Sequence, residues 1–340
     1  MQQRPVLFLI DVEPNTPYDR AGDAWSGTQI AFGELERLRH IWEDLTGQRV
    51  VFNWFLRCDP QIRQVWGRWD HIHALFPDFI SRLRDGEDYA GIHPHFWRWD
   101  MRGQRWFNDF TDAHWKEHCI RTRITGFQEM LGRRPQASRC GDRWMDQGVM
   151  DLLVREGIRY DLTLEPGSPA QRHWCDRQAT ERLPDQRYLP RRPYQPRSSD
   201  YRRARASDAP GPNLWVIPCS KTAPAWGLIR RFPPVGRFER TCNLALWPRV
   251  LQRHLEEALY GGSTDPLVLV LRSGDLARAE FLDNFQSTTA VITAHSGLRE
   301  MRFVAVPEAL ARRTEPVDGT GAGAGKDLAL RGDTYHVMGV

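Results

Sequence analysis

The chain has 340 residues, of which 41% are hydrophobic and 26% charged, and its formal net charge at pH 7 is +4. This balance is typical of a soluble globular protein with a sizeable core, and nothing in it requires a membrane. The only apolar run near the start, residues 6–10, is too short for a signal peptide or a spanning helix, so we expect a cytoplasmic protein.

Apolar stretches and helical patterns alternate along the chain. Residues 6–13 (VLFLIDVE) form a nearly continuous apolar run, which is typical of a strand buried on both faces of a parallel sheet. Further strands are expected at 49–58, 89–92, 136–140, 158–164, 214–219, 266–271 and 301–306. Apolar residues at helical spacing predict helices at 29–45, 72–83, 113–131, 146–156, 244–259 and 275–285. This alternation predicts an α/β fold, a distorted (β/α) barrel of seven or eight parallel strands similar to a TIM barrel.

Two segments interrupt the alternation. Residues 165–213 are rich in arginine and proline, and a loop of this length inside a compact domain is usually functional or mobile. No nucleic-acid recognition motif accompanies its arginines, so we expect them to meet an anionic substrate or solvent rather than nucleic acid. After Arg313, the run DGTGAGAG is typical of a flexible linker. We therefore expect one barrel domain at 1–313, followed by a Gly-rich linker and C-terminal tail at 314–340.

Two histidines follow the predicted strand at 89–92. On a strand, residues two apart point to the same face, so His93 and His95 aim together. Pro94 between them cannot donate to a sheet ladder, which indicates that the strand ends there. The pair suggests a metal site, and two hydrogen-bonded histidines of a loop are the alternative. The six cysteines are scattered without a CxxC pair, so they indicate neither a disulfide framework nor a thiolate zinc site.

Charged side chains follow several predicted strands, at the carboxyl ends where a barrel carries its chemistry. They are Asp11 and Glu13, Asp59, Arg139 and Asp142, and Asp161. Two imidazoles and a carboxylate can hold a divalent ion with an open position for water, and a second carboxylate can take the proton of that water. An arginine such as Arg139 can pin that base by a bidentate pair. For Asp59 and Asp142, capping of the next helix is the alternative.

Aromatic residues are concentrated next to the histidine pair. The flat faces of Trp97 and Trp99 can stack on sugar rings in a ligand cleft, and we assign Arg98 and Asp161 to the same substrate-binding role. Core filling is the alternative for any single tryptophan.

The order of these motifs resembles the polysaccharide deacetylases of the nodulation-protein type, carbohydrate esterase family four. The likeness spans residues 6–306 and rests on the acidic pair of the first strand, GIHPHFW, the Arg-containing segment SRCGDRW, the following YD-T segment and LWVIPCS. The resemblance implies metal-dependent hydrolysis of N- or O-acetyl groups on sugars. Asp11 would match the catalytic base, Glu13 the metal carboxylate, His93 and His95 the metal histidines, and Arg139 the residue that holds the base. Asp59 is a further candidate ligand, and zinc is the default ion, although such ligands also accept cobalt, nickel or manganese.

The sequence departs from the family pattern in three places. Val12 separates Asp11 and Glu13, whereas the family commonly has adjacent aspartates, and the two histidines lie two residues apart rather than four. The late strand LVLVLRSGDL has Arg272 where the family offers a histidine as general acid, so His295 becomes the candidate for that role. We therefore expect a metal-dependent hydrolase that removes acetyl groups from a sugar or polysaccharide precursor. The alternatives are a catalytically inactive barrel that binds carbohydrate and other chemistries on a barrel, since fold does not fix function.

Overall fold

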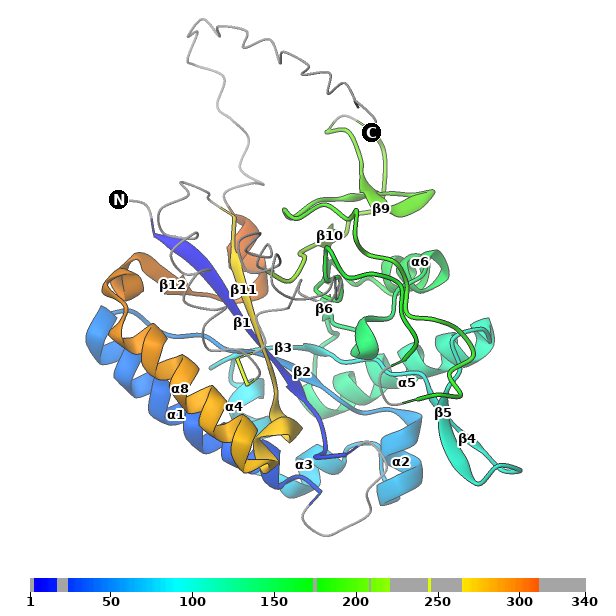
Figure 1. Cartoon of the computed structure of the whole chain (residues 1–340), viewed down its shortest axis with the longest axis horizontal. Helices are drawn as coiled ribbons and strands as arrows, with labels where there is room; N and C mark the ends of the chain where they lie inside the picture. Colours follow the sequence, from blue (N-terminus) through cyan, green and yellow to red (C-terminus); the bar gives the residue numbers. More distant parts are fainter. Residues whose placement is uncertain are drawn as a thin grey trace, which may run out of the picture.

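Strand β1 (Arg4–Val12) organises the sheet, because it pairs with three other strands, all of them parallel to it. The computed structural model describes residues 3–16, 24–173, 176–207, 209–220, 244–245 and 265–311. These residues form a curled sheet of eight parallel strands with helices around it (Figure 1). This arrangement confirms the predicted distorted (β/α) barrel.

All eight predicted strands are present. They follow the order β10-β7-β6-β3-β2-β1-β11, and the eighth, β12, pairs with the start of β1. Their bounds are β2 (Asn53–Leu56), β3 (Tyr89–Ile92), β6 (Ala137–Ser138), β7 (Tyr160–Asp161), β10 (Trp215–Val216), β11 (Leu267–Arg272) and β12 (Met301–Phe303). Most are shorter than the apolar runs that predicted them, because the runs continue beyond the paired residues, at both ends in β2 and β10.

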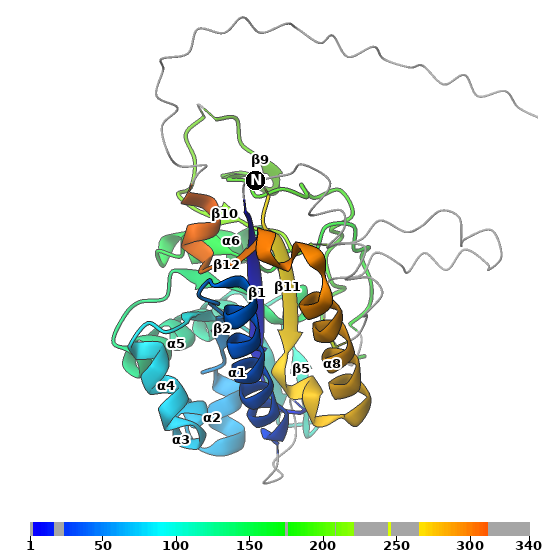
Figure 2. The same ribbon diagram turned by 90° about the vertical axis from the view of Figure 1, so that its left-hand side faces the viewer.

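Helices lie on the outer face of the sheet. Figure 2 shows α1 and α8 side by side against β1 and β11. The α-helices are α1 (Ser26–Thr46), α2 (Pro60–Trp66), α3 (His71–Leu75), α4 (Pro77–Arg84), α5 (Ala113–Leu131), α6 (Gln147–Arg155) and α8 (Ala279–Ala294). Short 3₁₀ turns are η1 (Gly141–Arg143), η3 (Ser273–Ala277), η4 (Ser296–Glu300) and η5 (Val306–Leu310).

The two faces of the sheet bury different residues. On β1, Phe8, Ile10 and Val12 pack into the large cluster beneath the helices, whereas Leu7 and Leu9 pack into a smaller cluster inside the curl. The inner cluster also holds residues of the other strands, namely Phe55, Ala137, Leu162, Ile217, Val268 and Val270. Since side chains alternate between faces, every second residue beyond this inner set continues along the inner face toward the mouth.

Three sequence predictions need correction. The helix expected at 72–83 is two helices, because Pro77 has no N–H for the helical ladder and the preceding Phe76 lies outside the helical region, at φ −134°. The helix expected at 275–285 begins with the turn η3, and α8 then continues to Ala294. Helix α2 was not predicted. The helix expected at 244–259 and the linker and tail at 314–340 lie almost entirely outside the described residues.

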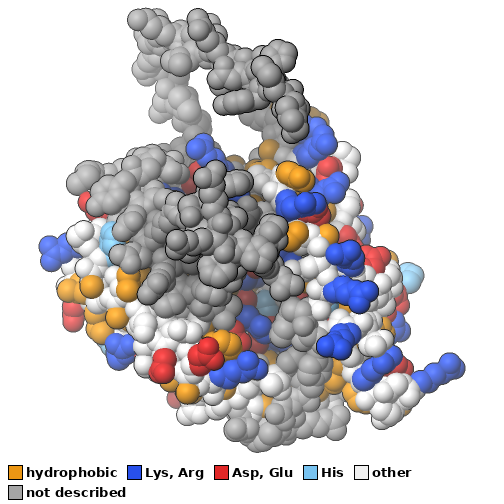
Figure 3. Space-filling view, viewed as in Figure 1, with side chains coloured by type: hydrophobic (Ala, Val, Ile, Leu, Met, Phe, Trp, Pro, Cys, Tyr) orange, Lys and Arg blue, Asp and Glu red, His pale blue; other side chains and the backbone are white. Residues whose placement is uncertain are grey.

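Two antiparallel hairpins lie outside the main sheet. They are β4 (Trp97–Asp100) with β5 (Arg105–Asn108), and β8 (Pro196–Arg197) with β9 (Asp200–Ala204). Arg202 and Arg203, in the second hairpin, both pair with Asp200. Figure 3 shows the face of the molecule that is seen in Figure 1. The Lys and Arg side chains drawn there are spread out with Asp and Glu between them, so the visible described residues form no uniform basic surface. Among the described helices, none is both long and apolar enough to cross a membrane.

The close packing of the inner face generates a stability prediction at Gly91. A Cβ atom on Gly91 would lie 2.7 Å from the carbonyl oxygen of Ala137 and 2.8 Å from the ring of Phe55. The backbone oxygen cannot move without disturbing β6, so we expect Gly91→Ala to cost about 1–3 kcal/mol in unfolding free energy by urea denaturation. Gly33→Ala is the matched control, because a Cβ there meets nothing within 4 Å, and it should stabilise α1 by about 0.4–1 kcal/mol. Equal stabilities of the two variants would contradict this packing.

Candidate metal centre

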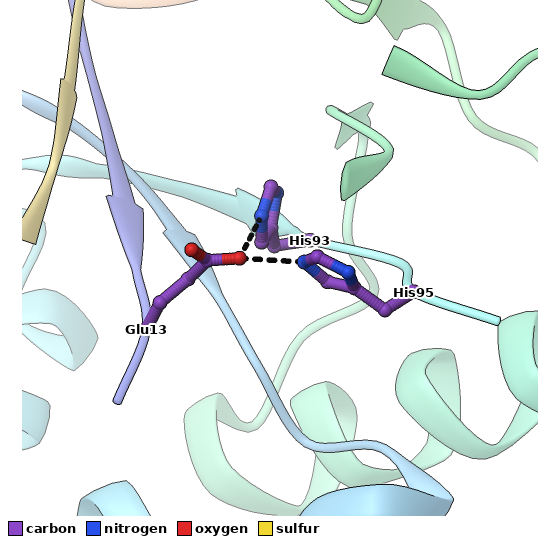
Figure 4. A group of neighbouring side chains, drawn as sticks. All are labelled: Glu13, His93 and His95. Carbon is purple, nitrogen blue, oxygen red and sulfur yellow. Dashed lines mark hydrogen bonds and ion pairs between the residues drawn. The ribbon is translucent and has the colours of Figure 1, made fainter. Parts of the chain in front are cut away.

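Three side chains from two strand ends converge at the mouth of the sheet. Figure 4 shows Glu13, which follows β1, pointing at His93 and His95, which follow β3. Glu13 Oε1 lies 3.0 Å from His93 Nε2 and 2.5 Å from His95 Nε2. All three side chains are buried. One donor atom from each lies within 4.8 Å of the others, so the three can hold one metal ion.

The outer nitrogens of both imidazoles face hydrogen-bond acceptors. His93 Nδ1 lies 2.5 Å from the carbonyl oxygen of Arg139, and His95 Nδ1 lies 3.1 Å from Asp142 Oδ2. The tautomer with the proton on each Nδ1 satisfies both of these outward acceptors, and it leaves a lone pair on each Nε2. Burial lowers the pKa of His93, although Asp11 and Glu13 raise it in part, so its neutral form is favoured.

In this tautomer, three acceptors face one another. Two imidazole lone pairs and a carboxylate oxygen repel unless a cation lies between them. An outward hydrogen bond to a carbonyl or carboxylate is also the usual support of a metal-bound histidine. The residues present thus fit a divalent ion.

Glu13 is held ionised from its other oxygen. The Arg272 guanidinium donates to Oε2, with its Nε at 2.9 Å, and the Ser273 hydroxyl accepts a hydrogen bond from the backbone N–H of Glu13. Burial raises the pKa of this carboxyl, but the Arg272 guanidinium holds it well below its usual value. Glu13 therefore has Oε1 left for an ion.

A second carboxylate lies beside this group. Arg139 Nε donates to Asp11 Oδ1 at 2.8 Å, and Arg139 also donates to the Leu162 carbonyl at 2.7 Å, which fixes the guanidinium. Asp11 Oδ1 lies 3.6 Å from His93 Nδ1. The predicted base and the predicted arginine are thus in contact, next to the candidate ligands.

These residues line one cavity of about 140 Å³. The lining residues are Asp11, Glu13, His93, His95, Arg139, Cys140, Gly141, Asp142, Arg143, Glu165, Leu183 and Arg272. A cavity of this volume has room for several water molecules or a small group such as an acetyl.

The turn after β6 is built around His95. A Cβ on Gly141 would lie 2.1 Å from the His95 ring, so only glycine fits there. Asp142 and Arg143 follow with φ 53° and 49°, in the left-handed region that L-residues rarely adopt. This backbone directs the Asp142 carboxylate at His95. The sequence suggested Asp142 only as a strand-end acid, and Gly141 gave no separate signal.

A third histidine supports Asp142, and sequence reasoning missed it. His173, from the long loop, has its Nε2 3.0 Å from Asp142 Oδ1, and its side chain is fully buried. Its Nδ1 accepts a hydrogen bond from the Asp176 N–H at 2.9 Å, so Nε2 carries the proton and donates to Asp142. Burial raises the pKa of Asp142, but His95 and His173 lower it below its usual value. No local motif marks His173, because its partner lies 31 residues earlier in the chain.

Asp59 is not among the converging ligands. Its carboxylate accepts from Arg57 at 2.7 Å and from Arg123 at 2.6 Å, and it caps α2 by accepting from the Ile62 N–H. Burial raises its pKa, but the two guanidinium groups hold it far below its usual value. Asp59 therefore occupies the helix-capping position that the sequence offered as the alternative. Within the described residues, the candidate metal group consists of Glu13 and the two histidines.

Two other candidates lie away from the cavity. Asp161 occupies the outer face of β7, opposite Leu162, where it accepts from the Thr163 N–H and hydroxyl. His295 follows the last residue of α8, six residues before β12, which pairs with the start of β1. It therefore lies at the opposite end of the sheet from Glu13, and its Nδ1 accepts from the Gly297 N–H.

The aromatic candidates divide between core and surface. Trp97 is buried, with its ring centroid 5.6 Å from that of His173. Arg98 and Trp99 line a separate surface hollow along the β4–β5 hairpin, and Arg98 also pairs with Asp109 at 2.9 Å. None of the three lines the cavity with Glu13.

The support of Asp142 by His173 can be tested through metal affinity. His173→Phe removes the donor and leaves Asp142 free to rotate away from His95, so we expect divalent-ion affinity to fall about 10-fold or more. His173→Gln retains an N–H for Asp142 and should recover part of the loss. Competition with a chromophoric chelator measures both. Equal affinities for wild type and His173→Phe would show that His95 is positioned without this residue.

The burial of Asp161 predicts a pH effect on stability. Desolvation raises its pKa to about 7, against the opposing effect of the Thr163 bonds and Arg139. The folded state thus prefers the protonated acid, and the stability from this group is present at low pH and is lost as pH rises toward 7. We expect Asp161→Asn to gain on the wild type by on the order of 2 kcal/mol between about pH 5 and pH 8, by urea denaturation. A constant difference would mean that Asp161 titrates normally.

No protein-family model matches this chain, and no curated protein matches it by sequence. Solved structures do match it. A protein from Parabacteroides distasonis assigned as a glycoside hydrolase/deacetylase superposes with TM-score 0.58 and 11% identity over 90% of this chain and 70% of that one. One from Mycobacterium smegmatis assigned as a polysaccharide deacetylase gives 0.51 and 17%, over 93% of both chains. The allantoinase PuuE gives 0.50 and 14%, over 90% and 88%.

At these identities the likeness shows a shared fold. The chain therefore has the barrel fold found in deacetylases and an allantoinase, as the sequence motifs led us to expect.

Proposed function

We propose that this protein is a metal-dependent hydrolase that removes an acyl group, acetyl in the first instance, from a sugar or polysaccharide precursor. The observation that carries the proposal is the convergence of Glu13 Oε1 with His93 and His95 as three mutually facing acceptors, beside the Asp11–Arg139 pair. The barrel fold shared with deacetylases supports it.

Glu13, His93 and His95 would hold a divalent ion, zinc by default, whose charge polarises the acyl carbonyl and acidifies a bound water. Asp11 would take the proton of the attacking water as general base. Arg139 fixes the direction of the Asp11 carboxylate, because its guanidinium donates to Oδ1 and is itself anchored on the Leu162 carbonyl.

The leaving amine or alcohol also needs a proton. Among the described residues, the histidines lining the cavity are His93 and His95, and the late strand contributes Arg272, which is bound to Glu13. We propose that Asp11 returns the proton that it received, so that one carboxyl group serves as base and then as acid.

The second candidate function is a carbohydrate-binding barrel without catalysis. The contact of Arg272 with Glu13 favours it, since a guanidinium occupies the late-strand position and neutralises the metal carboxylate. In that reading the cavity still binds a ligand, but no acyl group is released.

Metal content and acetate release separate the two functions. His93→Ala removes one ligand, so we expect a stoichiometric divalent ion in the wild type, measured by elemental analysis, to be lost. His40→Ala is the matched control, because His40 is exposed on α1, and it should retain the ion.

Asp11→Asn tests the base. It should keep the ion and lose about 100-fold or more of the rate of acetate release from acetylated sugars. A wild type that binds metal but releases acetate from no acetylated sugar would favour the binding function. A wild type without bound metal would contradict the metal-dependent hydrolase.

A further inference from the structure

Three arginines line the metal cavity, and they differ in how their charges are balanced. Arg139 pairs with Asp11 and Arg272 with Glu13. Arg143 has no carboxylate within ion-pair distance in the described part of the chain. Toward the described residues, its guanidinium donates to the carbonyl oxygen of Pro169 at 3.5 Å, the outer limit for a hydrogen bond.

The charge of Arg143 is partly removed from water. Its side chain lies half-buried in the cavity wall, and burial lowers its pKa below the usual value, an effect that the more distant Glu165 only partly offsets. A partly buried guanidinium without a counter-ion lowers the stability of the folded protein. That cost is recovered if an anionic ligand supplies the missing partner.

The backbone fixes this guanidinium in place. Arg143 is the second of two consecutive residues with positive φ, and each such residue costs about 1–2 kcal/mol. The turn is held from both sides, because Gly141 packs on His95 and Asp142 bonds to His95 and His173. Arg143 is therefore presented to the cavity by the same strained turn that supports the metal ligand.

The overall charge of the cavity also favours an anion. Four carboxylates (Asp11, Glu13, Asp142 and Glu165) and the three guanidinium groups line it. With neutral imidazoles its formal charge is −1, and a divalent cation makes it +1. An anion then enters a site of opposite charge, with Arg143 as the guanidinium that no carboxylate of the described residues pairs with.

We propose that Arg143 binds an oxyanion of the substrate, a carboxylate or a phosphate monoester carried close to the acyl group that the metal centre cleaves. This inference rests on the proposed function and narrows its substrate class from acylated sugars to anionic acylated sugars. Because Arg143 and the candidate metal ligands line the same cavity, we expect the anion and the acyl group to lie on the same or adjacent sugar units.

The test compares matched substrates on the metal-loaded, full-length protein. N-acetylglucosamine is paired with its 6-phosphate in one arm and with N-acetylmuramic acid, which carries a carboxylate, in the other. We expect one anionic member to have a KM about 10-fold or more below that of the neutral sugar, and the arm that shows it identifies the oxyanion. Arg143→Met should abolish that preference by raising KM for the anionic member about 10- to 100-fold, while leaving the neutral member within about twofold.

Arg143→Lys retains the charge without the fork and should fall between the two. Arg155→Met, an exposed arginine at the end of α6, is the control and should match the wild type. If Arg143→Met does not fold, as judged by circular dichroism, Arg143→Gln replaces it. Equal KM changes for anionic and neutral substrates, or no preference in either arm, would overturn the proposal.

A binding measurement distinguishes failure of this inference from failure of the hydrolase function. Inorganic phosphate and acetate are titrated calorimetrically into wild type and Arg143→Met. Each titration is repeated with a chelator that removes the metal ion, so that anion bound to the metal is told apart from anion bound to Arg143. Arg143-dependent binding without acetate release from any substrate would refute the hydrolase function and leave the anion site standing. Acetate release together with anion binding that is unchanged in Arg143→Met would support the hydrolase function and refute the anion site.

Discussion

The two-residue period of the parallel strands is the constraint on which the site depends. On β1 the inner-face series runs from Leu7 and Leu9 to Asp11, and Glu13 continues it beyond the strand. The same inner series leads from Val268 and Val270 to Arg272, and from Ala137 to Arg139. Apolar residues deep in the curl thus become charged residues at its mouth. Because the register of each strand is fixed by its buried residues, the charged groups are placed by the core rather than by their own attractions.

The candidate metal centre combines that placement with costs that the fold must carry. The two imidazoles and Glu13 place their ligand atoms toward one another, Asp142 and Arg143 have positive φ, and no carboxylate among the described residues pairs with Arg143. Groups of this kind persist where the surrounding structure holds them, and they occur at functional sites more often than elsewhere. Their concentration in one cavity of about 140 Å³ is the physical reason for assigning function there.

The sequence alone also contained information about which candidates cannot reach the mouth. Asp161 follows Tyr160 and precedes Leu162, both of which pack on the inner cluster, so the alternation places Asp161 on the outer face. Reading the phase of each strand, and not only its end, would have separated Asp161 from Arg139. Asp59 is different, because its partner Arg123 lies 64 residues further along the chain, and only the docking of α5 brings the two together. Placing His295 required the length of α8, because this helix carries the chain back to the far end of the sheet.

The sequence by itself determined the eight strands, the barrel class and the strand-end positions of Asp11, Glu13, His93 and Arg139, because burial and the period of two are local properties. Tertiary structure decided which oxygen of Glu13 remains for an ion, that Arg272 and not a histidine meets it, and that His173 supports Asp142. These are contacts between residues as far as 259 positions apart, and such pairings depend on loop paths that no local pattern encodes.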